Sequence, residues 1–365
     1  MREPIPSIPP LPPTIDPSYA PLTTALTKAN SAIAHLREQA ATFPYQSILI
    51  DRIGLIDAMA SCDMSGIQAA PKDVYAASLL AISRRTGPAK DVLTHRSTLK
   101  RGFDRLAYDN QTISNKTLIE MYRMLTGRHE ALRMIAGPVL RDTSGATIHE
   151  PPGEALEIQA QVKALETFIN EDGSGIDPLI RLAMILHQIE SIQPFLEGNG
   201  RLGRIITALF LVRSGLLEAP ILCLSQPLNQ TKTDYYQLSQ AVRDDDNWED
   251  WIIYILNALT QSTETTLEVI AGIRTLLADY SKQIKNELPT VHSPGLIGSL
   301  FRHPYTRIEF LQNDIGISAK KATRCLNSLA ELGYLTKHQV DDFDYFVNAP
   351  LVALLHKVGP SAQTD

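Results

Sequence analysis

The stretch from Gln193 to Arg204 constrains this chain more than any other, because a glycine-rich loop there joins two apolar, helix-patterned segments. One segment covers 180–192, and the other begins at Leu202, directly after Gly198-Asn199-Gly200. Glycine lets the backbone approach a ligand closely, and the unpaired N–H groups and dipole of a helix N-terminus favour an anion. The pattern therefore predicts an anion-binding loop between two packed helices.

Charged side chains surround this loop. Arg201 and Arg204 are three residues apart, so both can lie on one side of the first helical turn. Glu197, just before the glycines, offers the hard carboxylate oxygen that Mg²⁺ takes alongside phosphates. An anion loop, a metal ligand and two guanidiniums together predict a site for a nucleotide polyphosphate.

The whole string Gln-Pro-Phe-Leu-Glu-Gly-Asn-Gly-Arg-Leu-Gly-Arg resembles the signature of the Fic (Fido-domain) family, His-Pro-Phe-x-Asp/Glu-Gly-Asn-Gly-Arg-x-x-Arg. The resemblance implies a protein adenylyltransferase (AMPylase) that moves AMP from ATP to a protein hydroxyl. It also implies roles for single residues: Gly198, Asn199 and Gly200 cradle the α- and β-phosphates of ATP, Glu197 holds Mg²⁺, Arg201 contacts the β-phosphate and Arg204 the γ-phosphate.

Gln193 occupies the first position of the signature, where the family has its general base, a histidine. An imidazole titrates near neutral pH, whereas a carboxamide cannot hold the target's proton. Loss of a positioned base typically costs about 10²–10⁴-fold in rate. We therefore expect ATP binding with impaired catalysis. The alternative is an active AMP transferase that uses water or a base from its target.

A second departure lies about 130 residues earlier, in Ser61-Cys-Asp-Met-Ser65-Gly66. Many Fic proteins carry Ser/Thr-x-x-x-Glu-Gly/Asn on a helix here, and the glutamate pairs with the second motif arginine and excludes the γ-phosphate. Ser65 takes the place of that glutamate, and Asp63 lies on nearly the opposite face of the helix. We therefore expect no carboxylate to compete for Arg204.

Two further features bear on the target protein and on the adenine of ATP. Short β-favouring runs around Thr143-Ser144-Gly145 predict a hairpin within 137–152. The resemblance implies a flap that holds a target protein by strand addition, and a plain surface hairpin is the alternative. Tyr235 and Tyr236 correspond to a pair that flanks adenine in the family, although an aromatic stripe can also be core.

The chain as a whole predicts a mainly α-helical fold: a Fic helical core, the small β-hairpin flap and a C-terminal winged-helix module. We expect an N-terminal helical region over 1–110, the core over 111–285 and the module over 290–358. The proline-rich arm at 1–18 should be extended; packing on its own domain is favoured over docking in an SH3-type groove. Helices are expected at 21–41, 45–64, 71–84, 95–106, 115–125, 154–170, 178–191 and 202–212, and a long helix is expected to run up to about 285. Further helices are expected at 294–301, 307–312 and 318–332, followed by strands at 334–340 and 343–347.

The C-terminal module contains a segment, 317–326, that resembles the second helix of a helix-turn-helix, with Lys320, Lys321 and Arg324 available to phosphates. Residues 290–365 nevertheless hold seven Lys/Arg and seven Asp/Glu, and the expected wing tip is Asp341-Asp342. Since electrostatics supply most non-specific DNA affinity, protein contact or packing is favoured, and a DNA-binding regulator with a Fic sensor core is the alternative.

Composition limits the remaining classes. The net charge of −6 argues against a nucleic-acid-binding polycation. Cys62, Cys223 and Cys325 are scattered, which favours buried thiols in a reducing cytosol over disulfides or a metal site. The apolar runs are all shorter than 18 residues and no signal-peptide core precedes them, so we expect a cytoplasmic protein with no membrane span.

Overall fold

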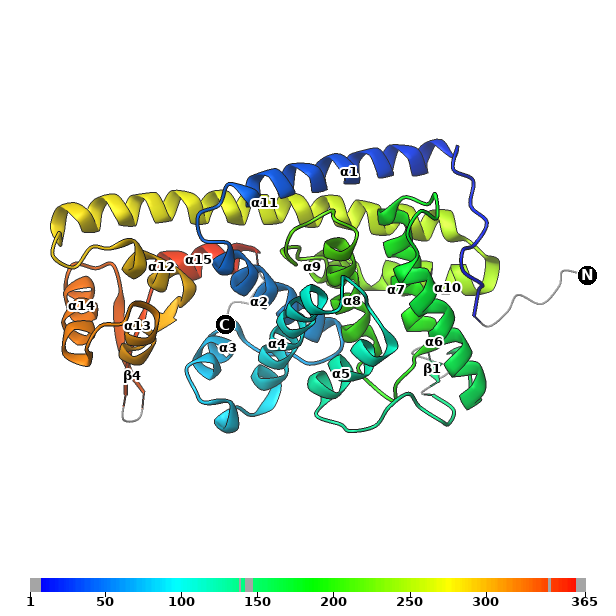
Figure 1. The fold of residues 1–365 in the computed structure, drawn as a ribbon, viewed down its shortest axis with the longest axis horizontal. Helices are drawn as coiled ribbons and strands as arrows, with labels where there is room; N and C mark the ends of the chain where they lie inside the picture. The colour runs from blue at the N-terminus through cyan, green and yellow to red at the C-terminus, as the bar shows by residue number, and fades with distance from the viewer. Residues whose placement is uncertain (1–7, 138, 142–146, 341–342, 359–365) are drawn as a thin grey trace, which may run out of the picture.

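The computed structural model describes residues 8–137, 139–141, 147–340 and 343–358, and it is mainly helical (Figure 1). The longest helix, α11 (Trp248–Glu287), runs along most of the elongated molecule, and α1 (Ala20–Ala41) lies beside it (Figure 1). The buried residues of α1 recur every three or four positions and include Ala25 and Ala29, so a stripe of small and apolar side chains faces α11. These two helices form one side of the molecule.

The motif lies at the centre of the helical core. Helix α7 (Pro178–Ile192) packs on α8 (Asn199–Arg213), and nearly every residue of both is buried. A helix that is apolar all round must be covered on all sides. The covering helices are α2 (Gln46–Met64), α4 (Gly87–Tyr108), α5 (Asn115–Thr126), α6 (Ala155–Asn170) and α11, while α3 (Pro71–Ser78), α9 (Ser225–Gln230) and α10 (Lys232–Asp245) complete this part.

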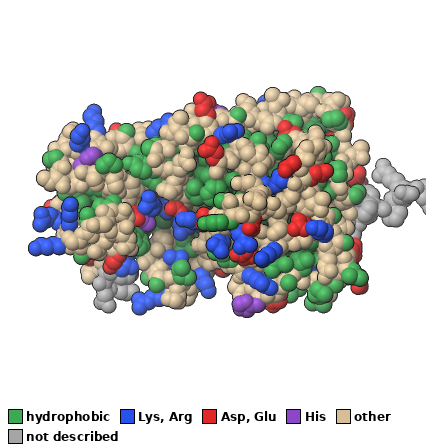
Figure 2. Space-filling model, viewed as in Figure 1, with side chains coloured by type: hydrophobic (Ala, Val, Ile, Leu, Met, Phe, Trp, Pro, Cys, Tyr) green, Lys and Arg blue, Asp and Glu red, His purple; other side chains and the backbone are tan. Residues whose placement is uncertain are grey.

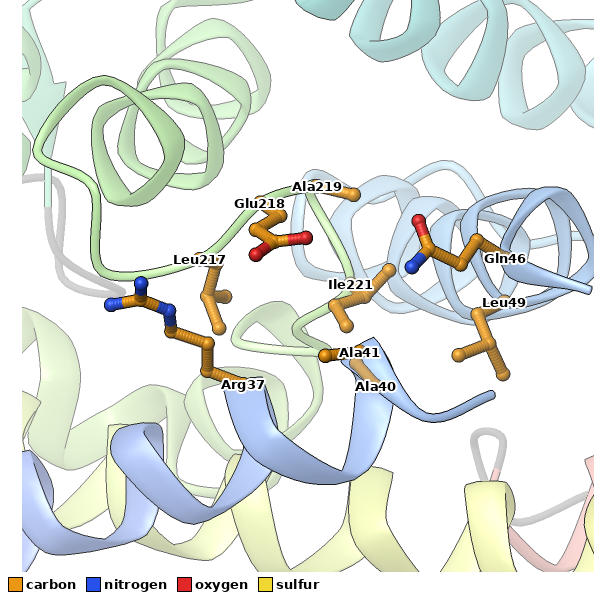
Figure 3. A pocket seen from close by; sticks show the side chains of 9 residues that line it. All are labelled: Arg37, Ala40, Ala41, Gln46, Leu49, Leu217, Glu218, Ala219 and Ile221. Atoms are coloured by element: carbon orange, nitrogen blue, oxygen red, sulfur yellow. The ribbon is translucent and has the colours of Figure 1, made fainter. Parts of the chain in front are cut away.

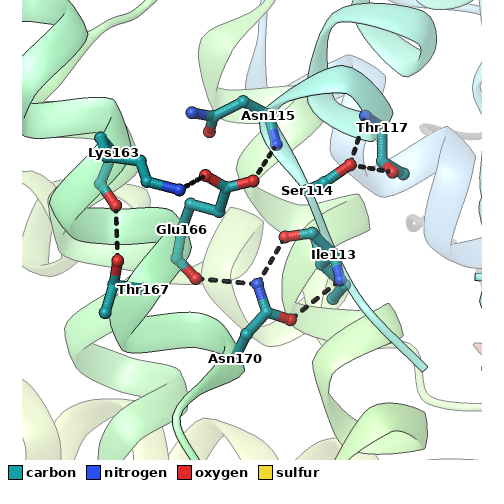
Figure 4. A network of polar contacts seen from close by, with 8 residues as sticks. All are labelled: Ile113, Ser114, Asn115, Thr117, Lys163, Glu166, Thr167 and Asn170. Carbon is teal, nitrogen blue, oxygen red and sulfur yellow. Dashed lines mark hydrogen bonds and ion pairs between the residues drawn. The ribbon is translucent and has the colours of Figure 1, made fainter. Parts of the chain in front are cut away.

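A polar network fixes the start of α5 against α6 (Figure 4). Ser114 caps α5 by accepting from the backbone N–H of Thr117. The backbone N–H of Asn115, the first residue of α5, donates to Oε1 of Glu166 at 2.9 Å. Asn170 bonds both the N–H and the carbonyl of Ile113. One orphan donor of the first turn is thus satisfied by the cap and another by a side chain of the neighbouring helix.

The C-terminal module follows α11. It contains α12 (Pro294–Arg302), β3 (Tyr305–Thr306), α13 (Ile308–Ile315), α14 (Ala319–Glu331), β4 (Thr336–Val340), β5 (Phe343–Val347) and α15 (Ala349–Val358). The sheet is antiparallel in the order β3-β5-β4, and Lys337 pairs with Phe346. The expected three helices and hairpin are present, and α15 returns to pack on α11 and α2. Asp341-Asp342, the expected acidic tip, lies outside the described residues.

Two expected boundaries were wrong. The helix expected over 71–84 ends at Ser78, whose hydroxyl donates to the carbonyl of Tyr75, and a short 3₁₀ turn at Ile82–Arg84 follows. The helix expected from 95 starts at Gly87 instead. Gly87 adopts a φ of 63° and Pro88 occupies the first turn, where its fixed φ suits a helix and its missing N–H costs nothing.

Three smaller features complete the fold. The described part of the proline-rich arm lies on the core, because Ile8 is buried and the Gln188 side chain donates to the carbonyl of Pro9 at 3.0 Å. A cavity of about 20 Å³ remains between the end of α1, the start of α2 and the segment after α8 (Figure 3). It has room for about one water and none of the motif lines it. In the part of the chain that the structure describes, each helix is too short or too polar to cross a membrane.

Candidate active site

The loop from α7 to α8 has a defined shape. Gln193 ends α7 in the left-handed region, with φ 45° and ψ 66°, and Gly198 begins α8 with φ 73°. The Asn199 side chain closes the loop, since its Oδ1 accepts from the N–H of Phe195 at 3.0 Å and its Nδ2 donates to the carbonyl of Phe195 at 2.8 Å. Phe195 is buried and stacks on Tyr122. The role of Asn199 seen here is therefore to shape the loop.

Arg133 fixes the position of Gln193, and the sequence offered no sign of it. Its Nε donates to the carbonyl of Gln193 at 2.6 Å and its Nη2 to that of Ile192 at 2.9 Å. Its Nη1 bonds the carbonyls of Ile135 and Pro152. These include carbonyls that a helix C-terminus leaves unpaired, where a cation is also favoured by the helix dipole. Burial lowers the pKa of Arg133.

The start of α8 has the features of an anion cradle. Among the described residues, no side chain accepts a hydrogen bond from its first N–H groups. A methyl group on Gly198 would come within 3.2 Å of Thr126 Cγ2, and one on Gly200 within 3.2 Å of both Arg204 Nη1 and Glu190 Oε1. Arg201 is only 8% exposed, and its buried Nη1 has no hydrogen-bond partner among the described residues. The same guanidinium reaches the loop through Nη2, which would lie 3.8 Å from a methyl group on Gly198. A buried guanidinium with an unpaired N–H close to such a loop suits a phosphate.

The sequence predicts a free Arg204, but in the structure its guanidinium is already hydrogen-bonded. Its Nε donates to the Ser61 hydroxyl at 2.8 Å, and its Nη2 donates to the Ser61 carbonyl at 2.8 Å and the Ser65 hydroxyl at 2.9 Å. A carboxylate is also present, because Glu190 Oε1 lies 3.7 Å from Arg204 Nη1. The expectation that no carboxylate competes for Arg204 was therefore wrong. The carboxylate belongs to Glu190, which lies about one turn before Gln193 on α7. Gly66 ends the α2 segment with φ 80°.

The structure separates the two tyrosines. Tyr235 is fully buried against Trp251, with ring centroids 5.1 Å apart, whereas Tyr236 is 44% exposed. Burial, and then the neighbouring Glu190, raises the pKa of Tyr235 well above its usual range. Burial likewise raises the pKa of Glu190, against the opposing effect of Arg204. Tyr236 is therefore the one of the pair that can meet a ligand without rearrangement.

Three histidines lie near the motif, and all are buried. Burial lowers the pKa of His149 to about 4 and that of His187 to about 3. Burial and the two motif arginines lower the pKa of His95 as well. His149 Nε2 lies 2.8 Å from the carbonyl of Ser191, and His187 Nε2 lies 3.1 Å from that of Ser239. All three are neutral at pH 7, and His187 is a core residue.

Glu197 is half exposed on the loop and its Oε1 lies 2.6 Å from Nε of Arg128. Magnesium bound with nucleotide needs only one or two carboxylates, since phosphates and water supply the other ligands. Glu197 fits that part if it exchanges Arg128 for the metal. The described residues contain no group of three His, Cys, Asp or Glu side chains placed to hold a metal by themselves.

The expected hairpin lies beside the end of α7. Strands β1 (Leu140–Arg141) and β2 (Thr147–His149) pair antiparallel, with Leu140 opposite His149. His149 closes the contact with α7 through the Ser191 carbonyl. The turn of the hairpin, including Thr143-Ser144-Gly145, lies outside the described residues.

Comparison with known families agrees with this geometry. The Fic/DOC family model matches 112–211, the Fic/DOC family N-terminal model matches 23–104, and the model of the protein adenylyltransferase SoFic-like C-terminal domain matches 276–351. Together they span well over half of the chain. The chain belongs to the Fic/DOC family.

Curated relatives of this Fic chain are named protein adenylyltransferases. One from Drosophila grimshawi is 23% identical over 192 residues, covering 52% of this chain and 36% of the relative. One from Nematostella vectensis is 26% identical over 199 residues, covering 52% and 43%. The Caenorhabditis elegans fic-1 protein is 27% identical over 132 residues, covering 36% and 24%. The matches thus cover less than half of the length of each relative.

Solved structures support the fold. A Fic family protein from Desulfovibrio desulfuricans G20 has a TM-score of 0.55 at 18% identity, covering 92% of this chain and 97% of that one. Residues 134–508 of C. elegans Fic-1 have a TM-score of 0.53 at 18% identity, covering 70% and 79%. At these identities the likeness concerns the fold alone.

Proposed function

We propose that this Fic chain binds ATP with Mg²⁺ at the start of α8 and that its AMP transfer is weak or absent. The observation that supports nucleotide binding is Arg201, whose buried Nη1 has no partner among the described residues and whose Nη2 lies close to Gly198 at the start of α8. Glu197 would hold Mg²⁺, which neutralises phosphate charge when bound. Gln193 carries the argument against catalysis, because its backbone is fixed and its amide cannot take a proton.

The state of Arg204 bears on how nucleotide enters. A γ-phosphate has to replace two serine hydroxyls and the looser contact with Glu190. The serine hydroxyls carry no charge, whereas a glutamate would add the attraction of an opposite charge to its hydrogen bond, so this exchange costs less than displacing a glutamate paired with the same arginine. The described contacts therefore act as a weaker barrier than the family's glutamate would.

Calorimetry with ATP and Mg²⁺ tests the nucleotide site. We expect saturable binding that weakens when Mg²⁺ is chelated and falls at least about tenfold in Arg201→Ala, because a hydrogen bond to a charged group contributes about 1.5–3 kcal/mol. Arg213→Ala is the matched control, since Arg213 ends the same helix and bonds Asn170 and Asp172 on the outside. Absence of ATP binding at millimolar concentration would remove the basis of the proposal.

Transfer of labelled AMP tests the catalytic part. Gln193→His restores a group that can accept the target's proton, and we expect labelling of the chain or of a lysate protein to rise at least about 10²-fold. Gln193→Asn keeps an amide and is the control. If the parent labels as fast as Gln193→His, the chain is an active AMP transferase and Gln193 is no handicap. Unchanged labelling in Gln193→His would show that more than the base is missing.

The surroundings of the site suggest its other contacts. The hairpin of β1 and β2 lies at the end of α7, next to Gln193, and we propose that it accepts a strand of the target protein. Cys62, Cys223 and Cys325 are free and buried, which fits a reducing compartment such as the cytoplasm.

A second candidate function concerns the C-terminal module, which we propose to be a winged helix. Lys320, Lys321 and Arg324 are exposed on α14 and form no ion pair within the described residues, and basic side chains gather at that end in Figure 2. This favours contact with a polyanion, while the balanced charge of the module favours protein contact. Retention on duplex DNA across a salt series distinguishes them. Nanomolar, sequence-specific binding lost in Lys320→Ala with Arg324→Ala would establish a DNA-binding regulator.

A further inference from the structure

A second cavity, separate from the motif, lies where the helical core meets the C-terminal module. Its walls come from α2, α3 and α4 on one side and from α12, β3 and α13 on the other. Its volume is about 130 Å³, roughly ten times what a single water needs. The side chains that set its chemistry are Asp51, Arg52, Tyr75, Arg96, Arg302 and Tyr305.

Arg52 is the decisive residue of this cavity. It lies in the middle of α2 and is only 6% exposed. Its buried Nε has no hydrogen-bond partner, and Arg52 forms no ion pair with any residue that the structure describes. Burial, and then the like charge of Arg96, lowers its pKa to about 10, so it remains charged at pH 7. A buried charge without a partner is unfavourable, and an anion in the cavity would relieve it.

Arg96 is the second cation and comes from α4. It is partly buried and likewise has no ion-pair partner in the described part of the chain. Asp51 lines the same cavity but lies beyond ion-pair distance of both arginines. Arg302, in contrast, is already paired with Asp314 at 3.1 Å. Asp51 offsets part of the charge of Arg52 and Arg96 without pairing with either, so these three side chains still leave the cavity a net positive charge, which an anion such as phosphate would balance.

We propose that this cavity is a phosphate-binding site in which Arg52 and Arg96 hold the oxyanion. Guanidinium forks match the spacing of phosphate oxygens, and in a partly dehydrated cavity such bonds are strong. The cavity is large enough for a phosphate group together with part of the molecule that carries it. The shared chemistry is the phosphate group, whether it is free or belongs to a nucleotide.

The walls of the cavity connect two parts of the molecule. Tyr75 of α3 stacks on Tyr305 of β3, with centroids 4.9 Å apart and rings nearly parallel. A phosphate held here would therefore join the core to the module. Arg52 also shares α2 with Ser61, which bonds Arg204, and their separation of nine positions corresponds to about 14 Å of helix. The site would thus brace the same helix that contacts the candidate active site.

Phosphate binding can be measured apart from the nucleotide site. In an Arg201→Ala background, we expect inorganic phosphate, pyrophosphate or AMP at millimolar concentration to raise the melting temperature and to bind saturably by calorimetry. Arg52→Met and Arg96→Gln should each weaken this binding at least tenfold, and Arg213→Gln should leave it unchanged. Equal affinity for phosphate and AMP indicates free phosphate as the ligand, whereas tighter AMP or pyrophosphate binding indicates a nucleotide source.

Stability without ligand separates this role from a structural one. Because Arg52 has no partner to lose, Arg52→Met should melt at or above the parent temperature in phosphate-free buffer. Arg96→Gln, at a less buried position, decides the matter if Arg52→Met does not fold. No saturable binding of any of the three ligands, or binding that survives both changes, overturns the proposal. Loss of ATP binding in Arg201→Ala with phosphate binding retained shows that the two sites are distinct.

Discussion

Arg204 is the motif residue whose contacts bear most directly on the proposed nucleotide site. Its guanidinium meets a hydroxyl and a carbonyl of Ser61, the hydroxyl of Ser65 and, less closely, the carboxylate of Glu190. A glutamate at position 65 would form an ion pair with Arg204 at the same point, because Ser65 already reaches the guanidinium at 2.9 Å. The difference between a firm and a weak hold on Arg204 thus rests on a single side chain.

Ser65→Glu should weaken ATP binding to this chain by about tenfold, because the opposite charge of a carboxylate adds roughly 1–2 kcal/mol to the bond that the neutral hydroxyl accepts from Arg204. In a Gln193→His background the same change should also suppress AMP labelling. Ser65→Gln has nearly the same size without the charge and should have little effect. Equal ATP affinity in Ser65→Glu and Ser65→Gln, measured by calorimetry, would show that position 65 does not control access to Arg204.

At this scale the sequence predicted the residues that belong to local patterns. The loop of Gly198 to Gly200 and the spacing of Ser61 and Ser65 can be read from short strings. Glu190 could not, because nothing in an apolar helix marks which polar residue faces Arg204. Arg133 was missed for a stronger reason: its partners are backbone carbonyls, two of them about 60 residues away, and any residue type supplies a carbonyl.

Helix packing is decided at positions where two elements come unusually close. Gly102 of α4 is such a position, since a methyl group there would lie 2.6 Å from Leu209 Cδ1 of α8 and 2.8 Å from Met121 Sδ of α5. Leu209 and Met121 are themselves buried, so they have little room to move. The close approach keeps α4 against the helix that carries the motif arginines.

Gly102→Ala should therefore destabilise the chain by about 1–2 kcal/mol, as overpacking outweighs the better helix propensity of alanine. Gly54→Ala is the matched control, because Gly54 is also inside a helix but its nearest neighbours, in Leu99 and Arg96, would lie at 3.8 and 3.9 Å. That change should stabilise by about 0.5–1 kcal/mol. Urea unfolding measures both, and a stable Gly102→Ala would mean that α4 and α8 can separate without cost.

Among the elements, helices with a clear apolar period were predicted with small errors, and those set by local backbone geometry were not. Helix α3 ends at Ser78, before the expected end, and α4 begins early because Gly87 and Pro88 form a helix start. Glycine and proline signal a break in the chain, but the side of the break on which a helix begins depends on φ, which a string of letters does not show.

The whole molecule is held together by contacts between distant segments. Helix α11 packs on α1, α7 and α15, and so joins the beginning, the motif and the end of the chain (Figure 1). The sequence indicates that α1 and α11 each have an apolar face, but any two such faces could pair. The arrangement follows only when all the faces are covered at once, which is why the apolar faces were predictable and their mutual packing was not.

Buried histidines give the whole molecule a pH dependence. Burial lowers the pKa of His187 to about 3 and of His149 to about 4, from 6.5, and lowers that of His95 too. Above pH 6.5 these rings are neutral whether the chain is folded or not. Below pH 6.5 these histidines bind protons in the unfolded chain but stay neutral in the folded chain, so stability falls as pH falls from about 6.5 towards 4.

The free energy of unfolding should drop by about 1.4 kcal/mol per pH unit for each such histidine in this window. Asp57 opposes part of the loss, because burial raises its pKa from 3.8 to about 6, and the stability it contributes is lost as pH rises across that interval.

Urea midpoints at pH 7, 6 and 5 should therefore fall, and His187→Gln should flatten the slope whatever it does to stability at pH 7. Exposed His35→Gln is the control and should leave the slope unchanged. A slope that is the same in the parent and in His187→Gln would mean that this ring takes up a proton in the folded chain, which would require water or a carboxylate to reach it within the core.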